Sequence, residues 1–472
     1  MKKVDDEKRR WRRRRILRIK FVLAASFCLP LLYLVAVPML WWLTIPYPGI
    51  LEPMQYPLSN ALAQIALTLP IIIVGYRFFL SGLKALFQRS PNMDTLIATG
   101  ALASVALSLY STYQIYIGNF GASDKLYFAP AGAIITISLL GKLREASAKC
   151  KVYKKVKRLT GKDSNITAWE SKPSQIRPVH WLDTVSGYYV PILGAIAVIA
   201  AGAWLYGGQS SSFTLTVFLT VFIIACPSSL GLAVPNAIAL STRKGAKQGI
   251  LIKGTEAFET AAQIDTVVLA TPELICKDTP GDAVVLPAPT IKESSQKAIQ
   301  TLHSMGIEVM LMTGGDLQEA EAAAQQAGIS RIFAGIQPQD SVNAVNELKS
   351  EGKKVAVIGS GASDAPVLLK TDAGIVIGLT SDKAIAASDI VLMRSDLADV
   401  AAAIKLCRRT MRVIRGNLFW AFGYHVAGVA VAAGLLHLTG GPLMNPVLAM
   451  AALFLGALSV FVNTLRLKST CR

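Results

Sequence analysis

The sequence is poor in charged residues and has no pair of cysteines at metal-site spacing. Only 17% of its 472 residues are charged, against about 25% in average soluble proteins. Hydrophobic residues make up 52%, and the mean hydropathy is +0.45. This composition excludes a wholly soluble globular protein. None of the six cysteines belongs to a Cys-x-x-Cys pair, which excludes a zinc ribbon and a thioredoxin-like centre.

Acidic residues are scarce as well, since 30 Asp and Glu stand against 48 Lys and Arg, for a formal net charge of +18. Residues 1–20 and 142–181 each contain eleven basic and three acidic residues, which gives +8 in each block. Together the two blocks carry +16 of the net charge. A chain this apolar is not a typical nucleic-acid binder, and we expect no nucleic-acid partner. Basic blocks between apolar segments indicate membrane topology instead.

The run from Arg12 to Arg15 has two other readings, a nucleic-acid patch or the start of a signal peptide. The apolar stretch after it is longer than the core of a signal peptide and has no clear small-residue cleavage site. We therefore interpret this run as part of a membrane anchor that lies on anionic lipid headgroups.

Eight apolar stretches are each long enough to cross a membrane as a helix, which takes about 20 residues. The links at 46–58, 208–211 and 438–442 contain no Lys or Arg, whereas the links on the opposite side are basic. Because basic residues stay on the cytoplasmic side, both termini and residues 241–415 should be cytoplasmic. The predicted spans are 21–45, 59–82, 95–117, 126–144, 187–207, 212–236, 417–437 and 443–465.

Residues 241–415 alternate short β-branched runs with helical patterns, which predicts a parallel sheet with helices on both faces. Ligands of such sheets bind beyond the carboxyl ends of the strands, so the turns after Leu269, Met312 and Ile358 should form any site. The predicted strands are Asp265–Leu269, Ile307–Met312, Arg331–Ala334, Lys354–Ile358, Gly374–Ile377 and Asp389–Met393.

The sixth predicted span contains Cys226-Pro227-Ser228, followed by Gly231-Leu-Ala-Val-Pro235 and by Gly245-Ala-Lys-Gln-Gly249-Ile-Leu-Ile-Lys253-Gly254. A proline in a span frees a backbone carbonyl, and a thiol beside it suits a soft ion such as Cu(I). Taken alone, Cys226-Pro227 is also compatible with a packed kink. The whole string closely resembles the heavy-metal (copper-type, class IB) P-type ATPases. Further matches are Asn92-Met93-Asp94-Thr95-Leu96, Ser363-Asp364-Ala365-Pro366 and Asn417-Leu418-Phe419-Trp420.

This resemblance implies a polytopic α-helical membrane protein of eight transmembrane helices, with a cytoplasmic α/β haloacid-dehalogenase-like (Rossmann-type) domain inserted after helix six. It also implies a multi-pass protein of a bacterial plasma membrane, with both termini cytoplasmic. The expected parts are a basic N-terminus (1–20), helices 1–4 (21–144), a shortened basic loop (145–183), helices 5–6 (184–240), the phosphorylation-type domain (241–415), and helices 7–8 with the C-terminus (416–472).

The chain departs from the family at the positions that carry catalysis. The aspartate that attacks the γ-phosphate of ATP is replaced by Ala270, with Thr271 after it, and Ala270 has no nucleophilic atom. Of the central acidic and basic groups only Asp364 remains in register, and it has a second reading as a helix cap. We therefore predict that ATP and Mg²⁺ are not used. Thr313 is the same as in the family. At the other positions, Gly315 replaces an aspartate, with the nearest acid displaced to Asp316, Ser341 replaces a lysine, and Ser360 replaces an aspartate.

Two domains of the family have no counterpart in the sequence. No Thr-Gly-Glu, the actuator motif, occurs anywhere, and few residues separate Arg158 from Asp183. After Cys276 only a short Pro/Gly stretch precedes the helix predicted from Ile291, where the family inserts its nucleotide-binding domain. His-Pro, the adenine-side signature, is absent too. Because folded domains usually need about 50 residues or more, neither domain fits.

The family's ion path is only partly present. Its Cys-Pro-Cys reads Cys226-Pro227-Ser228, its Tyr-Asn reads Tyr424-His425, and its Met with two Ser reads Leu453 with Gly456-Ala457. Cys226 and His425 remain as a candidate two-ligand site for Cu(I), with Met450 as a possible third ligand.

These departures predict a catalytically inactive pseudo-P-type ATPase that acts by binding, as a scaffold, regulator or metal-handling partner. The alternative is a transporter that retains some transport or metal binding. Expected partners are membrane lipids, another membrane protein such as an intact pump, or a copper chaperone at the stretch Gly82, Lys84 and Arg89, which resembles the family's docking ledge.

Overall fold

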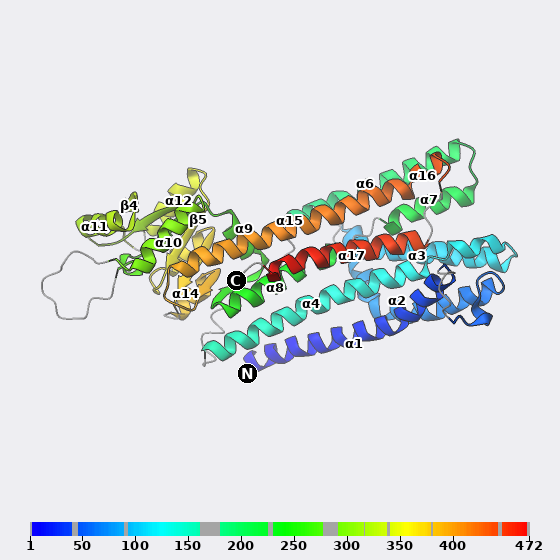
Figure 1. Cartoon of the computed structure of the whole chain (residues 1–472), viewed down its shortest axis with the longest axis horizontal. Helices are drawn as coiled ribbons and strands as arrows, with labels where there is room; N and C mark the ends of the chain where they lie inside the picture. The colour runs from blue at the N-terminus through cyan, green and yellow to red at the C-terminus, as the bar shows by residue number, and fades with distance from the viewer. Residues whose placement is uncertain are drawn as a thin grey trace. The chain divides into compact units, whose positions relative to one another are not determined.

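The chain forms two compact units (Figure 1). The first, the helical unit, contains Met1–Ser147, His180–Ala237 and Ile414–Arg472; the second, the α/β unit, contains Ala148–Val179 and Ile238–Val413. The computed structural model describes residues 2–39, 46–88, 93–160, 180–224, 230–276, 291–315, 317–337, 340–378, 381–441 and 446–469.

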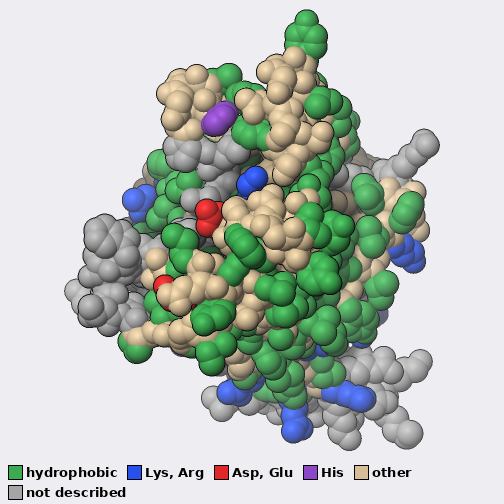
Figure 2. Space-filling view, turned by 90° about the vertical axis from the view of Figure 1, so that its right-hand side faces the viewer, with side chains coloured by type: hydrophobic (Ala, Val, Ile, Leu, Met, Phe, Trp, Pro, Cys, Tyr) green, Lys and Arg blue, Asp and Glu red, His purple; other side chains and the backbone are tan. Residues whose placement is uncertain are grey.

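Long apolar helices make up the helical unit because their residues are hydrophobic around most of the helix circumference. The helices that lie wholly or partly in this unit are α1 (Lys2–Ala36), α2 (Pro57–Phe87), α3 (Met93–Tyr116), α4 (Phe128–Thr160), α6 (His180–Tyr206), α7 (Ser211–Ile224), α8 (Leu230–Lys247), α15 (Ala398–Ala432), the short α16 (Leu435–Leu438) and α17 (Pro446–Ser469), with short 3₁₀ turns at Val37–Met39, Gly49–Leu51 and Phe120–Lys125. Of these, α4, α8 and α15 also contribute residues to the α/β unit. Figure 2 shows a face of the molecule on which hydrophobic side chains predominate.

Four helical stretches are long and apolar enough to cross a membrane: Trp11–Ala36, Pro57–Phe87, Asp94–Tyr116 and Phe120–Arg144. They correspond to the first four predicted spans, and the remaining four spans stay predictions. For the first span, predicted at 21–45, the apolar stretch within α1 is Trp11–Ala36, and residues 40–45 lie outside the described residues. Pro38 lies in the 3₁₀ turn that follows, and its ring prevents continuation of the α-helix.

Glycines let the first four helices approach one another closely. Gly132 of α4 packs against α1 and α2, since a Cβ there would lie 2.9 Å from Leu31 Cδ2 and 3.2 Å from Ile71 Cδ1. At Gly82 of α2 a Cβ would overlap the carbonyl oxygen of Asp94 and lie 2.8 Å from the Ala98 side chain. Small residues are therefore what allows these backbones to pack, as is usual between membrane helices.

The α/β unit is built on a seven-stranded sheet of order β1-β7-β6-β5-β2-β3-β4. Its strands are β1 (Ile250–Ile252), β2 (Thr266–Leu269), β3 (Glu308–Met312), β4 (Arg331–Phe333), β5 (Val355–Gly359), β6 (Ala373–Ile377) and β7 (Ile390–Leu392), and its helices are α9 (Gly254–Gln263), α10 (Glu293–Ser304), α11 (Leu317–Ala327), α12 (Ser341–Ser350), α13 (Ala365–Lys370) and α14 (Asp382–Ala387), with a 3₁₀ turn at Pro272–Leu274.

All six predicted strands are confirmed and pair in parallel as expected, but a seventh strand makes the sheet mixed. The strand β1 was not predicted, and it pairs antiparallel with β7, with Ile250 opposite Leu392. The other neighbours are parallel, for example Val268 beside Met310 and Val357. The fold is therefore a mixed sheet with one antiparallel edge strand, a common variant of the doubly wound architecture.

Both faces of the sheet are covered, as the near-continuous apolar strands require. On one face, α12, α13 and α14 contribute Val345, Leu368 and Ile385 to a core that contains Val268 and Val357. The chain moves from β2 to β4 in one direction and from β5 to β7 in the other. With right-handed crossovers this reversal places α10 and α11 on the opposite face.

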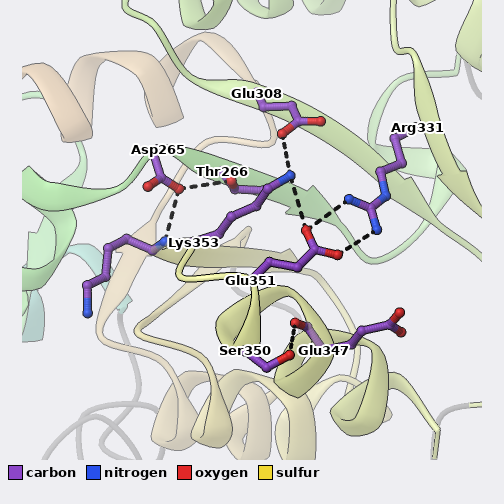
Figure 3. A network of polar contacts seen from close by, with 9 residues as sticks. Asp265, Thr266, Glu308, Arg331, Glu347, Ser350, Glu351 and Lys353 are labelled. Atoms are coloured by element: carbon purple, nitrogen blue, oxygen red, sulfur yellow. Dashed lines mark hydrogen bonds and ion pairs between the residues drawn. The ribbon is translucent and has the colours of Figure 1, made fainter.

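An ion-pair network, the β3–β5 network, occupies the edge of the sheet where the strands begin (Figure 3). Arg331 donates to both carboxylate oxygens of Glu351, at 3.1 and 3.2 Å. Lys353 Nζ lies 2.7 Å from Glu308 Oε2 and 3.6 Å from Glu351 Oε2. Asp265 accepts the backbone N–H of Lys354 at 2.9 Å. The network joins the starts of β2, β3, β4 and β5, at the edge opposite to the strands' carboxyl ends.

The carboxyl of Glu351 should make the stability of the α/β unit depend on acid pH. Its hydrogen bond with Arg331 favours the ionised form and lowers its pKa below the ordinary value of 4.5. A lowered carboxyl pKa gives stability that is present above pH 4.5 and is lost as the pH falls through the lowered pKa. Glu351→Gln should therefore unfold at a lower temperature than the natural chain at pH 6, with the difference shrinking below pH 4.5. Glu347→Gln, which removes a carboxylate of the same helix and leaves the Arg331–Glu351 pair in place, is the control for the loss of a carboxylate at pH 6.

Candidate functional site

A cavity of about 130 Å³ lies in the α/β unit at the carboxyl ends of β2, β3 and β5, and its walls are mostly uncharged. This is the edge at which doubly wound sheets bind ligands. Five of the positions singled out in the sequence line it together. The lining residues are Ala270, Thr271, Met312, Thr313, Gly314, Ile336, Ser341, Ser363, Asp364 and Val367.

Ala270 follows the last residue of β2 and is held in place through its backbone. Its N–H donates to the carbonyl of Ile358 on β5 at 2.9 Å, which continues the β2–β5 pairing one residue beyond the strand. Ala270 thus presents only a methyl group at the end of β2, at the position where a longer side chain would contact a ligand. The hydroxyl oxygen of the adjacent Thr271 is buried and has no hydrogen-bond partner within the described part of the chain.

The Asp364 carboxylate is buried and organises the loop after β5. It lies at the N-cap position of α13 but makes no capping hydrogen bond to that helix, so the helix-cap reading of this residue was wrong. Its Oδ2 instead accepts the backbone N–H groups of Ser360 and Gly361, both at 2.9 Å, and Oδ1 accepts the Ser363 hydroxyl at 3.2 Å. Asp364 therefore closes the β5–α13 loop on itself.

Gly359 makes this fold-back possible. A Cβ at Gly359 would lie 2.6 Å from Asp364 Oδ2 and 2.7 Å from Asp364 Cβ, closer than side chains pack. The last residue of β5 therefore has to be a glycine for the carboxylate to occupy its position.

The other two loops at the cavity present hydroxyl groups. The Thr313 hydroxyl accepts the N–H of Gly315 at 3.1 Å and thereby shapes the turn after β3. Ser341 begins α12, and its hydroxyl donates to the carbonyl of Gln337 at 3.3 Å. Gly315 and Ser360 thus adjoin the cavity through their hydrogen bonds to Thr313 and Asp364 without lining it.

The lining offers little charge to a ligand. Asp364 is the one charged residue among the described residues that line the cavity, and its Oδ2 already accepts two N–H groups. No described lining residue is a lysine or arginine. Cys276 of the same unit is not among the lining residues, and burial raises the pKa of its thiol, so that the unreactive protonated form is favoured.

These groups do not fit a transferring phosphoryl group with Mg²⁺. The transfer needs a nucleophile, and the charge on the phosphate oxygens needs cations and metal ligands around it. Ala270 supplies no nucleophile, Ser341 no positive charge, and a single carboxylate engaged with backbone N–H groups is a poor Mg²⁺ site. The hydroxyls of Thr271, Thr313 and Ser363 can bind polar groups but cannot replace those charges.

The second predicted site lies in the helical unit and is only partly described. Cys226 lies outside the described residues. His425 of α15 is buried, and its Nδ1 lies 2.7 Å from the carbonyl oxygen of Ile224. Because a carbonyl only accepts, Nδ1 carries the proton and Nε2 keeps its lone pair. His425 thereby satisfies the last carbonyl of α7, two residues before Cys226. Among the described residues, no group of three His, Cys, Asp or Glu side chains could hold a metal ion.

Ser363 and the apolar residues Met312, Ile336 and Val367 line the cavity but were not predicted as site residues. Ser363 directly precedes Asp364, so its proximity could have been inferred. Ile336 arrives through a long-range contact that sequence spacing does not reveal, in which its N–H donates to the Thr313 carbonyl at 3.1 Å.

The seven-stranded sheet, with a cavity at the carboxyl ends of its strands, can be compared with known domain families. The haloacid dehalogenase-like hydrolase family matches residues 228–370, a range that includes every strand from β1 to β5. The α/β unit is therefore a haloacid dehalogenase-like domain with an altered site.

Relatives of the whole chain define the family. The copper-exporting P-type ATPase of Staphylococcus aureus (strain Newman) is 27% identical over 652 aligned positions, which cover 95% of this chain and 79% of the relative. The probable copper-transporting ATPase PacS of Synechococcus elongatus is 27% identical over 642 positions, covering 93% and 85%. A crystal structure of a zinc-transporting PIB-type ATPase shares the fold, with a TM-score of 0.66 at 18% identity over 94% of this chain and 99% of that one. Over nearly its whole length, the chain is therefore similar to heavy-metal P-type ATPases.

Proposed function

We propose that this protein is a catalytically inactive member of its family that acts by binding rather than by transport. The observation that carries the proposal is the uncharged site: Ala270 stands at the end of β2, and Asp364 is the one charge among the described lining residues. Phosphoryl transfer from ATP depends on electrostatic stabilisation. A site that is folded but lacks the carboxylate nucleophile and the cations for phosphate can maintain the shape of the domain without catalysing phosphoryl transfer.

The alignment with a relative is longer than this chain, which supports the proposed absence of the actuator and nucleotide-binding domains. The alignment with the S. aureus relative runs over 652 positions, more than the 472 residues present here, so the relative contains long segments with no counterpart. In the α/β unit, Cys276 and Ile291 form a β-bridge, and Lys292 N–H donates to the Ile275 carbonyl at 2.9 Å. The stretch 277–290 between these residues is too short to hold a nucleotide-binding domain.

The altered residues are small or neutral, while the sheet core remains apolar. Val268, Val357 and Val376 are at most 1% exposed. Random decay would also place polar residues in this core. We therefore infer selection for the fold without catalysis. The proposed partner is another protein of the bacterial plasma membrane, foremost an intact pump of the same family, with a copper chaperone as the second candidate.

The alternative, residual metal transport, has less support. The imidazole of His425 could bind a soft ion together with Cys226. The Nδ1 atom of this imidazole is occupied by the Ile224 carbonyl, however, which gives the side chain a sufficient structural role. Without acyl-phosphate chemistry, nothing in the described α/β unit would drive an ion across the membrane.

Incubation of the purified full-length protein with γ-labelled ATP and Mg²⁺ tests the proposal. We expect no label that survives acid and is released by hydroxylamine, which is the signature of an acyl phosphate. The matched variant Ala270→Asp restores the carboxylate alone and should also remain unlabelled, because no cation lines the cavity to stabilise the transferring phosphoryl group.

An intact copper-exporting relative, labelled in parallel, is the positive control. Acid-stable, hydroxylamine-sensitive labelling of the natural chain would refute the proposal outright. Labelling of Ala270→Asp alone would show that the rest of the site is still competent and would contradict the electrostatic argument.

A further inference from the structure

Two cations of the helical unit converge at one place without a carboxylate. Lys20 of α1 and Arg77 of α2 meet at the side chain of Tyr76: Lys20 Nζ lies 5.0 Å from the centre of the tyrosine ring, and Arg77 Nε lies 3.4 Å from its hydroxyl oxygen. No Asp or Glu pairs with either cation among the described residues. Lys20 Nζ has one protein acceptor, the carbonyl of Val74 at 3.2 Å, so donors remain for another group.

A neighbouring cation on α4 shows what a paired lysine looks like in this unit. Lys142 Nζ lies 2.9 Å from Asp94 Oδ1 and 4.2 Å from the centre of the Phe78 ring. Lys142 thus has both an aromatic face and a carboxylate, whereas Lys20 has an aromatic face and a backbone carbonyl but no carboxylate among the described residues. The position of the missing anion is open to the outside, because Tyr76 is 46% exposed and Arg77 is exposed.

The surroundings of this cluster are apolar and exposed, as expected for a surface in contact with lipid. Along α2 the exposed face contains Leu69, Ile73, Tyr76 and Leu80 at helical spacing, and along α1 Ile19 and Leu23 are exposed. Lys20 is the last basic residue before the apolar run 21–36 of α1, and Arg77 lies ten residues before the end of α2. Because Lys20 Nζ contacts Val74 and Tyr76 of α2, the two cations lie at the same level of neighbouring helices.

From this geometry we infer that Lys20, Tyr76 and Arg77 form a binding site for the phosphate of an anionic phospholipid. The two cations and the phenol bind the headgroup phosphate, and the exposed stripes of α1 and α2 contact the acyl chains. Basic clusters between membrane helices commonly recognise such headgroups. This site is independent of the proposed loss of catalysis, since it lies in the helical unit and involves none of the residues around Ala270.

Native mass spectrometry of the full-length protein in detergent tests the site, with phosphatidylglycerol titrated against phosphatidylcholine. We expect the natural chain to retain phosphatidylglycerol preferentially. Lys20→Ala with Arg77→Ala should weaken that binding about 25-fold, at roughly fivefold for each cation. The charge-conserving pair Lys20→Arg with Arg77→Lys should retain most of it, which would separate loss of binding from misfolding.

The matched control removes two charges elsewhere, Lys125→Ala with Lys383→Ala, and should bind phosphatidylglycerol like the natural chain. Equal weakening in this control would mean a general charge effect and would overturn the site. So would equal retention of phosphatidylcholine, or unchanged phosphatidylglycerol binding in the Lys20→Ala, Arg77→Ala variant. Displacement of the lipid by an excess of inorganic phosphate would identify a free-anion site and refute the lipid assignment.

Discussion

Replacing Gly359 by alanine should destabilise the α/β unit by about 3 kcal/mol, through overpacking and the loss of buried hydrogen bonds to a carboxylate. The added Cβ would lie 2.6 Å from Asp364 Oδ2 and would push the carboxylate off the N–H groups of Ser360 and Gly361. Thermal alkylation of Cys407 reports this unfolding, because the Cys407 thiol is completely buried within the unit. For a unit of this size the unfolding temperature should fall by about 6–12 °C.

Gly315→Ala is the control for this experiment. It lies in another loop beside the same cavity, and a Cβ there meets only Thr313 Oγ1 at 3.4 Å, an ordinary contact. We expect a change within about 0.5 kcal/mol. If Gly359→Ala were as stable as Gly315→Ala, the described position of Asp364 would be wrong.

Replacing Gly82 by alanine should have a comparable effect on the helical unit, about 2–3 kcal/mol. A Cβ at this position of α2 would overlap the backbone of Asp94 and lie 2.8 Å from the Ala98 side chain, so that α2 and α3 would have to separate. The separation would also break the 3.1 Å hydrogen bond from the Thr95 hydroxyl to the Gly82 carbonyl. Alkylation of Cys28, a buried thiol on α1, should begin at a lower temperature.

Gly202→Ala on α6 is the matched control, because nothing lies within 4 Å of a Cβ there and alanine favours a helix over glycine. It should unfold no earlier than the natural chain. The two reporters also check each other: Gly82→Ala should affect Cys28 first, and Gly359→Ala should affect Cys407 first. An identical shift of both thiols in both variants would contradict the division into two units.

The fold of the α/β unit was largely predictable because its strands are local apolar runs. The runs at Val267–Leu269 and Val355–Ile358 indicate strands wherever they lie in the chain. The strand β1 escaped prediction because it pairs antiparallel at the sheet edge with β7, which lies far along the sequence. Lys253 illustrates the same limit: its Nζ is buried and donates to the Ile385 carbonyl at 2.6 Å, a contact that no local pattern encodes.

Half of the residues that line the site were predictable, but its geometry was not. Turns after parallel strands must meet at one edge, which brought Ala270, Thr313 and Asp364 together as expected. The orientation of the Asp364 carboxylate was not predictable, because an aspartate before a helix is usually a cap. Whether it caps or folds back depends on the space left by Gly359, which is a tertiary property.

The β-bridge between Cys276 and Ile291 lies where, on the proposed function, the nucleotide-binding domain of the relatives would be missing. It holds the two ends of the intervening stretch close to each other. A domain whose termini lie close together can be inserted or removed between two such adjacent residues without disturbing the core of the surrounding domain. The same position is suitable for engineering. If a nucleotide-binding module were inserted between Cys276 and Ile291, the β-bridge between these two residues would already hold the ends of the module close together.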